Sequence, residues 1–356
     1  MSEAVRWLYG ALMVASSATA VLGNLLLLLL LLLHRELRSD TRGFSLSLGV
    51  SDLALGLSTI PFGAHNGLAG WEGPPSGGAL CQGSAFLFLL LQTASLHSLA
   101  WATVDKFTEI CFALSYRRLW TAARSRAALA LVWTFSLLSA ALPLLGFGRF
   151  AYSESRFLCC PSFAPEQRLF VALWMAAGVV APILTMCSLY GYIVFVARKQ
   201  ARRGTFRCNE QHCFYVPANT YLKSSVVMVT NSVCLLLCWL PYISVCLYET
   251  FSGLRSPAAL SALSCWLCVS SAAFNPWISC LTQTRYRDAA RRSLGSFVRK
   301  CCCTERPVEP RPQSASLQMD ATNRISTTTT TTTTTATNTP PLTLSPKLQH
   351  HSDPAS

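Results

Sequence analysis

A single carboxylate interrupts one of the long apolar stretches of this chain. Asp52 lies in SLSLGVSDLALGLSTIPF and is the only acidic residue well inside any of the long uncharged segments. An ionisable group at membrane depth is costly, so it indicates a functional site by default. The alternative is a protonated, hydrogen-bonded Asp52 with a structural role only.

Cysteines outside the apolar segments suggest further chemistry. Cys81 lies at the start of the third segment, and Cys159 and Cys160 lie in the loop after the fourth. Both places are expected on the oxidising side of a membrane, so Cys81 is predicted to form a disulfide with one of the two. The sequence does not decide which one.

Two other cysteine groups lie near the basic regions. Cys208, His212 and Cys213 are of the types that bind zinc, but three ligands at one irregular spacing are a weak signal. Cys301, Cys302 and Cys303 follow a basic amphipathic run and are better placed for S-palmitoylation. The alternative is three reduced thiols without a role.

The elements that position these residues are predicted to be membrane helices. Of the 356 residues, 51% are hydrophobic and 13% are charged, against roughly 25% charged in soluble domains. Seven segments are long enough to span a bilayer as helices. They cover about residues 7–33, 43–66, 80–104, 127–148, 169–197, 224–248 and 257–283. The fold class is therefore an all-α membrane protein, a bundle of seven transmembrane helices.

The net charge of +13 is concentrated in alternate loops. The basic positions include Arg35, Arg38, Arg42, Lys106, Arg117, Arg118, Arg124, Arg126, Arg198, Lys199, Arg202, Arg203, Arg207, Lys223, Arg285, Arg287, Arg291, Arg292, Arg299 and Lys300. The positive-inside rule places these loops and the C-terminus in the cytoplasm and the N-terminus outside. Contact with anionic membrane lipid explains this charge without nucleic acid or any other partner.

Four regions are expected along the chain. Residues 1–6 form a short extracellular N-terminus, and residues 7–283 form the seven-helix domain. Residues 284–303 read as an amphipathic helix on the membrane surface that ends in the cysteine cluster. Residues 304–356 are rich in Ser, Thr and Pro and are expected to be a disordered cytoplasmic tail.

The third segment is expected to be the central helix. Phe88, Gln92, Ser95 and Leu99 fall on one face at helical spacing, and lipid would penalise the two polar groups. This face should therefore point into the protein.

With these residues in order, the chain resembles the rhodopsin-like (class A) G protein-coupled receptors over about residues 5–303. The resemblance rests on one signature for each helix: Asn24, Asp52, Cys81 with Asp105–Phe107, Trp133, Pro182 with Tyr190, Cys238–Pro241 including Trp239, and Asn275–Pro276. The resemblance implies the seven-helix fold, a plasma-membrane location and coupling to heterotrimeric G proteins. It points to no particular member of the family.

The departures from the family pattern concern the conformational switch. Lys106 stands in place of the family's Arg, Phe107 in place of its Tyr, and Ser279 in place of the Tyr that closes Asn-Pro-x-x-Tyr. Tyr221 stands where many relatives have Glu. The switch and G protein coupling residues are then Asp105, Lys106, Phe107, Tyr190, Asn275, Pro276 and Ser279.

The resemblance also implies a sodium site near the middle of the membrane. Its oxygen ligands would be Asp52, Ser95, Ser271, Asn24 and Asn275. Ser271 stands where relatives often have Asn, which puts the affinity in doubt.

The ligand cavity implied by the resemblance lies in the extracellular half. Candidate lining residues are Phe88, Leu89, Gln92, Trp239, Tyr242, Tyr248, Glu249 and Trp266, and for each aromatic the alternative is plain packing between helices. Phe88 stands where amine receptors carry Asp, so a charged amine would find no counter-ion. Val269 stands where opsins carry the retinal Lys, so retinal is not expected. An apolar ligand, a peptide or no ligand remains.

Two functions stay open. The first is a ligand-responsive or constitutively active receptor, with phosphorylation of the tail and arrestin docking as family features and a passive tail as the alternative. The second is a seven-helix protein that does not couple and serves as a scaffold, decoy or modulator of another receptor. A transporter is disfavoured because neither half of the chain mirrors the other. No nucleophile–base pair or credible metal set indicates an enzyme.

Overall fold

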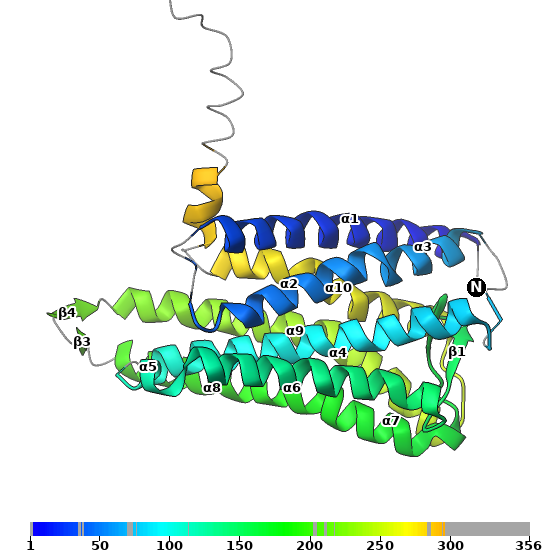
Figure 1. Cartoon of the computed structure of the whole chain (residues 1–356). Helices are drawn as coiled ribbons and strands as arrows, with labels where there is room; N and C mark the ends of the chain where they lie inside the picture. The colour runs from blue at the N-terminus through cyan, green and yellow to red at the C-terminus, as the bar shows by residue number, and fades with distance from the viewer. Residues whose placement is uncertain are drawn as a thin grey trace, which may run out of the picture. The chain divides into compact units, whose positions relative to one another are not determined.

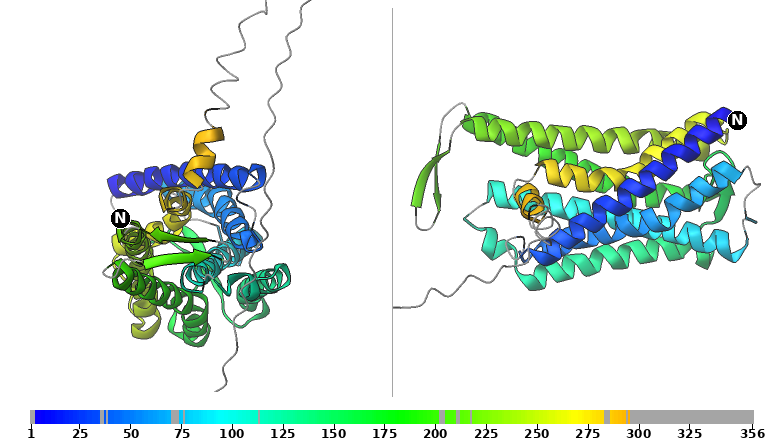
Figure 2. Two further views of the ribbon diagram at one scale, coloured as in Figure 1. Left: turned by 90° about the vertical axis from the view of Figure 1, so that its left-hand side faces the viewer. Right: turned by 90° about the horizontal axis from the view of Figure 1, so that it is seen from above.

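A computed structural model describes residues 3–34, 37, 39–69, 74–75, 77–112, 114–201, 205–209, 212–216, 218–282, 286–293 and 295. Among these residues, seven helical stretches are long and apolar enough to cross a membrane, as predicted. They run side by side as one bundle (Figures 1 and 2).

The helices of the bundle have the following bounds. Spans one to four are α1 (Glu3–Leu33), α2 with α3 (Arg42–Leu57 and Thr59–Ala69), α4 (Ala79–Cys111), and α6 with the 3₁₀ turn η2 (Ala122–Ala141 and Leu142–Leu145). Span five combines η3 (Pro165–Gln167), α7 (Arg168–Trp174), the π-helical turn η4 (Met175–Val180) and α8 (Ala181–Ala201). Spans six and seven are α9 (Ala218–Ser252) and α10 (Ala258–Thr282). Residues 286–293 are also helical.

In the part of the chain that the structure describes, the loops contain two short hairpins and one helical turn. In the first, β1 (Phe150–Ser153) pairs antiparallel with β2 (Leu158–Pro161), and Tyr152 lies opposite Cys159. In the second, β3 (Thr205–Asn209) pairs with β4 (His212–Val216). The helical turn is α5 (Tyr116–Leu119). We call the end of the bundle that carries β1 and β2 the hairpin end, and the opposite end, which carries α5, the basic end (Figure 1).

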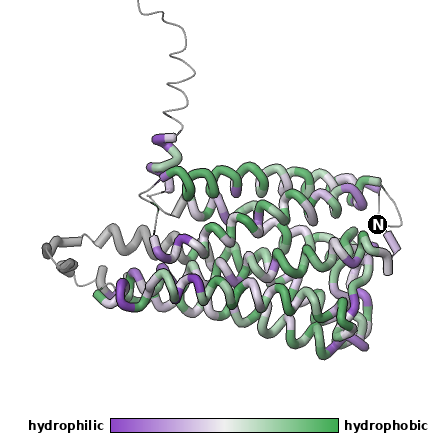
Figure 3. The backbone as a smooth tube through the Cα atoms, in the orientation of Figure 1, coloured by the Kyte–Doolittle hydropathy of each residue, from purple (hydrophilic) through white to green (hydrophobic). Residues whose placement is uncertain are grey.

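Polar and apolar residues are arranged as a membrane protein requires. Large apolar side chains such as Leu22, Leu33 and Leu131 are 65–70% exposed on the outer surface of the helices. Hydropathy along the backbone is highest in the middle of the helices, and hydrophilic residues gather toward the two ends (Figure 3). The interior instead contains buried polar side chains, among them Asn24, Asp52 and Gln92.

The central position predicted for the third span is confirmed. Phe88, Gln92 and Ser95 of α4 are 1–5% exposed. The helix runs on to Cys111, past the predicted end at residue 104, and it contacts α2, α6, α8, β1 and β2. The face that carries these three residues is therefore protein interior.

Candidate functional site

Asp52 lies at the centre of a buried polar cluster that joins three helices. Its carboxylate oxygen Oδ1 accepts a hydrogen bond of 2.6 Å from the Ser95 hydroxyl on α4. Its Oδ2 accepts one of 2.7 Å from the Asn275 amide on α10. Asp52 itself is fully buried. The carboxylate thus ties α2 to the central helix and to the helix that carries the Asn-Pro pair.

Two of the five predicted sodium ligands form hydrogen bonds with groups other than this carboxylate. The Asn24 amide donates to the carbonyl oxygens of Ala20, at 2.8 Å, and Ala272, at 3.0 Å. The Ser271 hydroxyl donates to the carbonyl oxygen of Cys268, within its own helix. Asp52, Ser95 and Asn275 are therefore brought together, and Asn24 and Ser271 serve contacts within and between helices.

Replacing Asp52 with asparagine is expected to change basal or ligand-evoked signalling by about twofold or more, because it replaces one of the two hydrogen-bond acceptors with a donor facing Ser95 or Asn275. The measurement is G protein activation normalised to surface level. Ser136→Ala is the matched control, since the buried Ser136 hydroxyl donates to the Val132 carbonyl oxygen of its own helix, α6. Signalling and sodium sensitivity equal to wild type would reduce Asp52 to a structural residue.

Five of the residues predicted for the ligand cavity are buried in the hairpin half of the bundle. Phe88, Leu89, Gln92, Trp239 and Tyr242 are at most 2% exposed. The Gln92 amide donates to the carbonyl oxygen of Cys268 on α10 at 3.2 Å. The Gln92 Oε1 and Trp239 Nε1 atoms are buried without a hydrogen-bond partner in the structure. Such groups are rare in protein interiors.

The other three cavity candidates have different roles. Tyr248 is 49% exposed on the outer surface of α9, so its prediction as a cavity residue is wrong. The Trp266 indole donates to the Ser16 hydroxyl on α1 at 3.1 Å, which makes it a contact between α1 and α10. Glu249 is paired with Arg156 of the loop between β1 and β2 at 2.5 Å.

The β1–β2 hairpin closes over the cavity residues. A disulfide joins Cys81 at the start of α4 to Cys159 in β2, which settles the choice that the sequence left open. Cys160 is a buried free cysteine, and burial raises the pKa of its thiol to about 11. The ring of Phe163, just after β2, lies edge-on to the ring of Tyr242 with centroids 6.2 Å apart.

Neither Arg156 nor Phe163 was predicted from the sequence. Their partners lie 93 and 79 residues away along the chain, and no local pattern indicates such a pairing. Burial lowers the pKa of a guanidinium, but in Arg156 the surrounding ionisable groups, Glu249 among them, more than offset this and raise it. Arg156 therefore keeps its charge although it is only 4% exposed.

A cavity of about 140 Å³ opens among the helices toward the basic end. Its lining includes Leu27, Leu31, Thr41, Arg42, Thr103, Asp105, Lys106, Met186, Tyr190, Cys238, Asn275, Ser279 and Tyr286. Five of the seven predicted switch residues are among them. The other two are Phe107, whose ring packs on Phe112 and Tyr192, and Pro276, which is buried.

The switch residues in this cavity bond to groups that the sequence analysis did not predict. The Lys106 ammonium pairs with Glu109 at 2.8 Å, one turn further along α4. The Tyr116 hydroxyl of α5 donates to Asp105 at 2.6 Å, and burial together with this bond raises the pKa of Tyr116. Thr103 and Tyr190 share a hydroxyl–hydroxyl bond of 2.9 Å. The Lys106–Glu109 pair follows helical spacing and could have been found from the sequence.

Comparison with known proteins agrees with this geometry. Residues 23–278 match the model of the 7 transmembrane receptor (rhodopsin family). The chain belongs to this family of receptors. Family members signal through heterotrimeric G proteins. The seven helical spans of the described part of this chain agree with its membership of this receptor family.

The relatives of the chain are receptors at modest identity. It is 27% identical to the histamine H2 receptor of Canis lupus familiaris over 308 residues, which are 85% of this chain and 81% of the relative. It is 25% identical to the alpha-1A adrenergic receptor of Oryctolagus cuniculus, over 81% of this chain and 67% of the relative. It is 25% identical to the adenosine receptor A2a of Canis lupus familiaris, over 84% of this chain and 74% of the relative.

Several predicted sites lie outside what the structure describes. The cysteine cluster Cys301–Cys303 and the tail after it are not described, and neither are the side chains of Tyr221, Cys208, His212 and Cys213.

Proposed function

We propose that this receptor activates a heterotrimeric G protein through the cavity at its basic end, with an energy gap between its inactive and active arrangements that is small enough to give basal activity. The observation that carries the proposal is that Asp105, Lys106, Tyr190, Asn275 and Ser279, from three different helices, line this one cavity. A cavity bordered by movable helices can enlarge to admit a partner.

The hairpin end is proposed to lie outside the cell and the basic end in the cytoplasm, with the receptor in the plasma membrane. The Cys81–Cys159 disulfide supports this, because such bonds form on the oxidising side. Arg117, Arg118 and Arg124 lie at or near α5, at the basic end, as the positive-inside rule requires of the cytoplasmic side.

The ligand is proposed to be an apolar molecule or a peptide if one exists, and not a biogenic amine. Two of the relatives are named for histamine and adrenergic ligands, but Phe88 offers an amine no charge. Glu249 is already paired with Arg156. An amine would have to compete with that buried pair.

Other family features are kept as proposals. A sodium ion would use Asp52, Ser95 and Asn275, whose oxygen atoms suit a hard cation, although the Asn275 amide nitrogen faces Asp52 here. Palmitoylation of Cys301, Cys302 and Cys303, contact with membrane lipid and arrestin binding to the tail rest on the sequence alone.

The altered switch residues set the expected energy gap. Lys106 keeps the charge of an Arg but lacks its planar fork of donors, and it is already paired with Glu109. Ser279 is too short to reach across the cavity as a Tyr would. Each missing contact weakens the active arrangement by ~1 kcal/mol, an ordinary net hydrogen-bond contribution. Tyr221 in place of an acid weakens the inactive arrangement too, because it cannot form an ion pair with Lys106.

Combining Lys106→Arg with Ser279→Tyr is expected to raise maximal G protein activation about threefold or more, because it restores two contacts of the active arrangement. The measurement is a panel of G protein activation assays on the expressed receptor without added ligand, normalised to surface level. Lys106→Ala with Ser279→Ala is the matched control and should not raise activation.

A second candidate function is a non-coupling scaffold, decoy or modulator of another receptor. The pairing of Lys106 with Glu109 favours it, because an ammonium that already has a carboxylate partner is a poorer contact for another protein. If the Arg–Tyr variant reaches the surface and stays silent with every G protein class, with and without activating changes in α9, this second function replaces the first.

A further inference from the structure

The loop between β1 and β2 folds inward and is held by several spans. The Tyr9 hydroxyl of α1 donates to the carbonyl oxygen of Arg156 at 2.8 Å. The Asn66 amide of α3 donates to the carbonyl oxygen of Phe157 at 3.1 Å. Cys159 is bonded covalently to α4. Residues 156–163, which we call the inner segment, are therefore fixed at the hairpin end, and all except Ser162 are buried.

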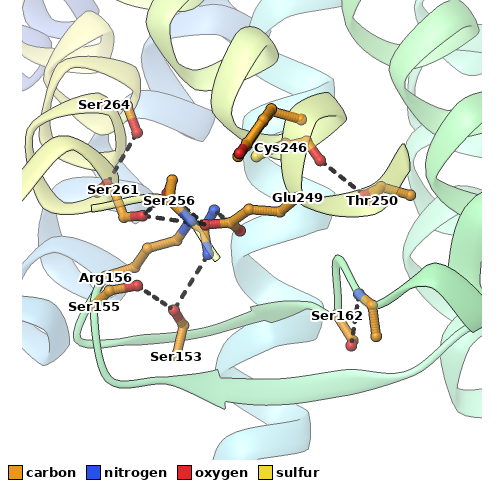
Figure 4. Close-up of polar contacts among 12 residues, drawn as sticks. Ser153, Ser155, Arg156, Ser162, Cys246, Glu249, Thr250, Ser256, Ser261 and Ser264 are labelled. Carbon is orange, nitrogen blue, oxygen red and sulfur yellow. Dashed lines mark hydrogen bonds and ion pairs between the residues drawn. The ribbon is translucent and has the colours of Figure 1, made fainter. Parts of the chain in front are cut away.

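A buried ion pair connects the inner segment to α9. Arg156 and Glu249 are bonded at 2.5 Å, with side chains 4% and 12% exposed (Figure 4). The other Glu249 oxygen accepts hydrogen bonds from the hydroxyls of Ser256, at 2.6 Å, and Ser261, at 3.3 Å. Since Ser261 belongs to α10, the pair draws together the outer parts of α9 and α10 and the hairpin. Such a desolvated charge pair is sensitive to the loss of either partner.

A chain of ring contacts leads from the inner segment into the bundle. The Arg156 guanidinium lies 4.8 Å from the centre of the Phe163 ring. Phe163 is edge-on to Tyr242, and Tyr242 is edge-on to Trp239 with centroids 6.4 Å apart. Phe163 thus stands where a bound ligand would contact the cavity residues Tyr242 and, through it, Trp239.

The position of Pro241 connects these contacts with the width of the cavity at the basic end. Pro241 lies within α9, and a proline inside a helix removes a backbone hydrogen bond and allows a bend there. Glu249 is eight residues beyond it, about 12 Å along the helix axis. When a helix pivots about one point, moving the part on one side of that point inward moves the part on the other side outward. Contraction at the hairpin end therefore favours a wider cavity at the basic end.

We propose that the inner segment, residues 156–163, is a built-in ligand of this receptor: it occupies the site above Trp239 and, through Phe163 and the Arg156–Glu249 pair, stabilises the active arrangement. The proposal rests on the proposed function, because it explains the basal activity. The segment fills the role of an agonist that is always bound.

The test compares Phe163→Ala with Phe147→Ala, and Glu249→Gln with Glu154→Gln. Phe147 and Glu154 lie on the same loop and are exposed, so they are matched controls. Basal G protein activation per surface receptor is expected to fall about fivefold for Phe163→Ala and Glu249→Gln, and to stay within about twofold for the controls. Exchanging the pair, Arg156→Glu with Glu249→Arg, is expected to restore part of the loss of Glu249→Gln.

A second readout separates this proposal from the proposed function. Intramolecular energy transfer between fluorophores in the α8–α9 loop and at the C-terminus reports the position of α9 without any G protein. A change in transfer for Phe163→Ala and Glu249→Gln with a silent G protein panel would uphold the built-in ligand and overturn coupling. Unchanged transfer and unchanged or raised basal activation, at normal surface level, would overturn the built-in ligand. If Phe163→Ala fails to reach the surface, Phe163→Leu replaces it, and if Glu249→Gln fails, the exchanged pair replaces it. Basal activation and energy transfer are measured on these variants in the same way.

Discussion

Replacing Cys81 with serine is expected to remove most of the receptor from the cell surface, leaving about a fifth or less. The Cys81–Cys159 disulfide closes a loop of 78 residues, and its removal costs about 2–5 kcal/mol in a typical domain. It also frees the hairpin that carries Arg156 and Phe163. The measurement is antibody labelling of intact cells against total receptor.

Cys160→Ala is the matched control, because it changes the cysteine adjacent to Cys159 without touching the disulfide. Neighbouring residues of a strand point to opposite faces, so Cys160 cannot replace Cys159 without a change of register. The raised pKa of its buried thiol keeps it protonated and unreactive near neutral pH. Cys159→Ser should match Cys81→Ser. A normal surface level of the Cys81 variant with ligand-free signalling intact would contradict the expectation.

The number and order of the spans could be predicted because each needs only length and hydropathy. The ends of the helices were less predictable. The third span was predicted to end before Asp105, where charge begins, but α4 continues to Cys111. Charge marks the end of the membrane span and not of the helix, and the Lys106–Glu109 pair lies in this last part of α4. The first helix likewise begins at Glu3, before the predicted start at residue 7.

The buried polar cluster around Asp52 was predictable from the cost of an unpaired carboxylate in an apolar helix. A carboxylate in an apolar helix has few ways to be satisfied, and Asp52 indeed bonds to Ser95 and Asn275. Helical period also explains one wrong prediction. Glu249 lies seven residues after Tyr242 and shares its face, whereas Tyr248 lies six residues after it and turns outward.

The contacts of the β1–β2 hairpin could not be predicted from the sequence. Arg156 and Phe163 lie in a loop without helical periodicity, and their partners on α9 are set by how the loop folds back. Hydropathy and family motifs say nothing about such a fold. The structure was needed to connect this loop with Trp239.

The close approach of α1 and α10 leads to the second large expected effect. Gly23 precedes Asn24 on α1, and a Cβ atom at Gly23 would lie 2.6 Å from Cγ of the Pro276 ring. Real Cβ atoms essentially never come closer than 3.0 Å to another heavy atom. A proline ring cannot turn aside, so the two helices would have to separate. Separation would also lengthen the 3.0 Å bond from Asn24 to the Ala272 carbonyl oxygen.

Gly23→Val is therefore expected to destabilise the receptor by about 3 kcal/mol, the upper part of the range for overpacked interiors. The measurement is thermal unfolding in detergent with a thiol-reactive fluorophore, which reports exposure of buried free cysteines such as Cys238, Cys246 and Cys265. The midpoint should fall by about 6 °C or more. Gly191→Val is the matched control, since Gly191 is also helical and a Cβ there meets nothing within 4 Å. The helix propensities of Gly and Val are the same at both positions, so only the contact with Pro276 differs. Equal midpoints for the two variants would show that α1 and α10 do not pack as closely as the structure has them.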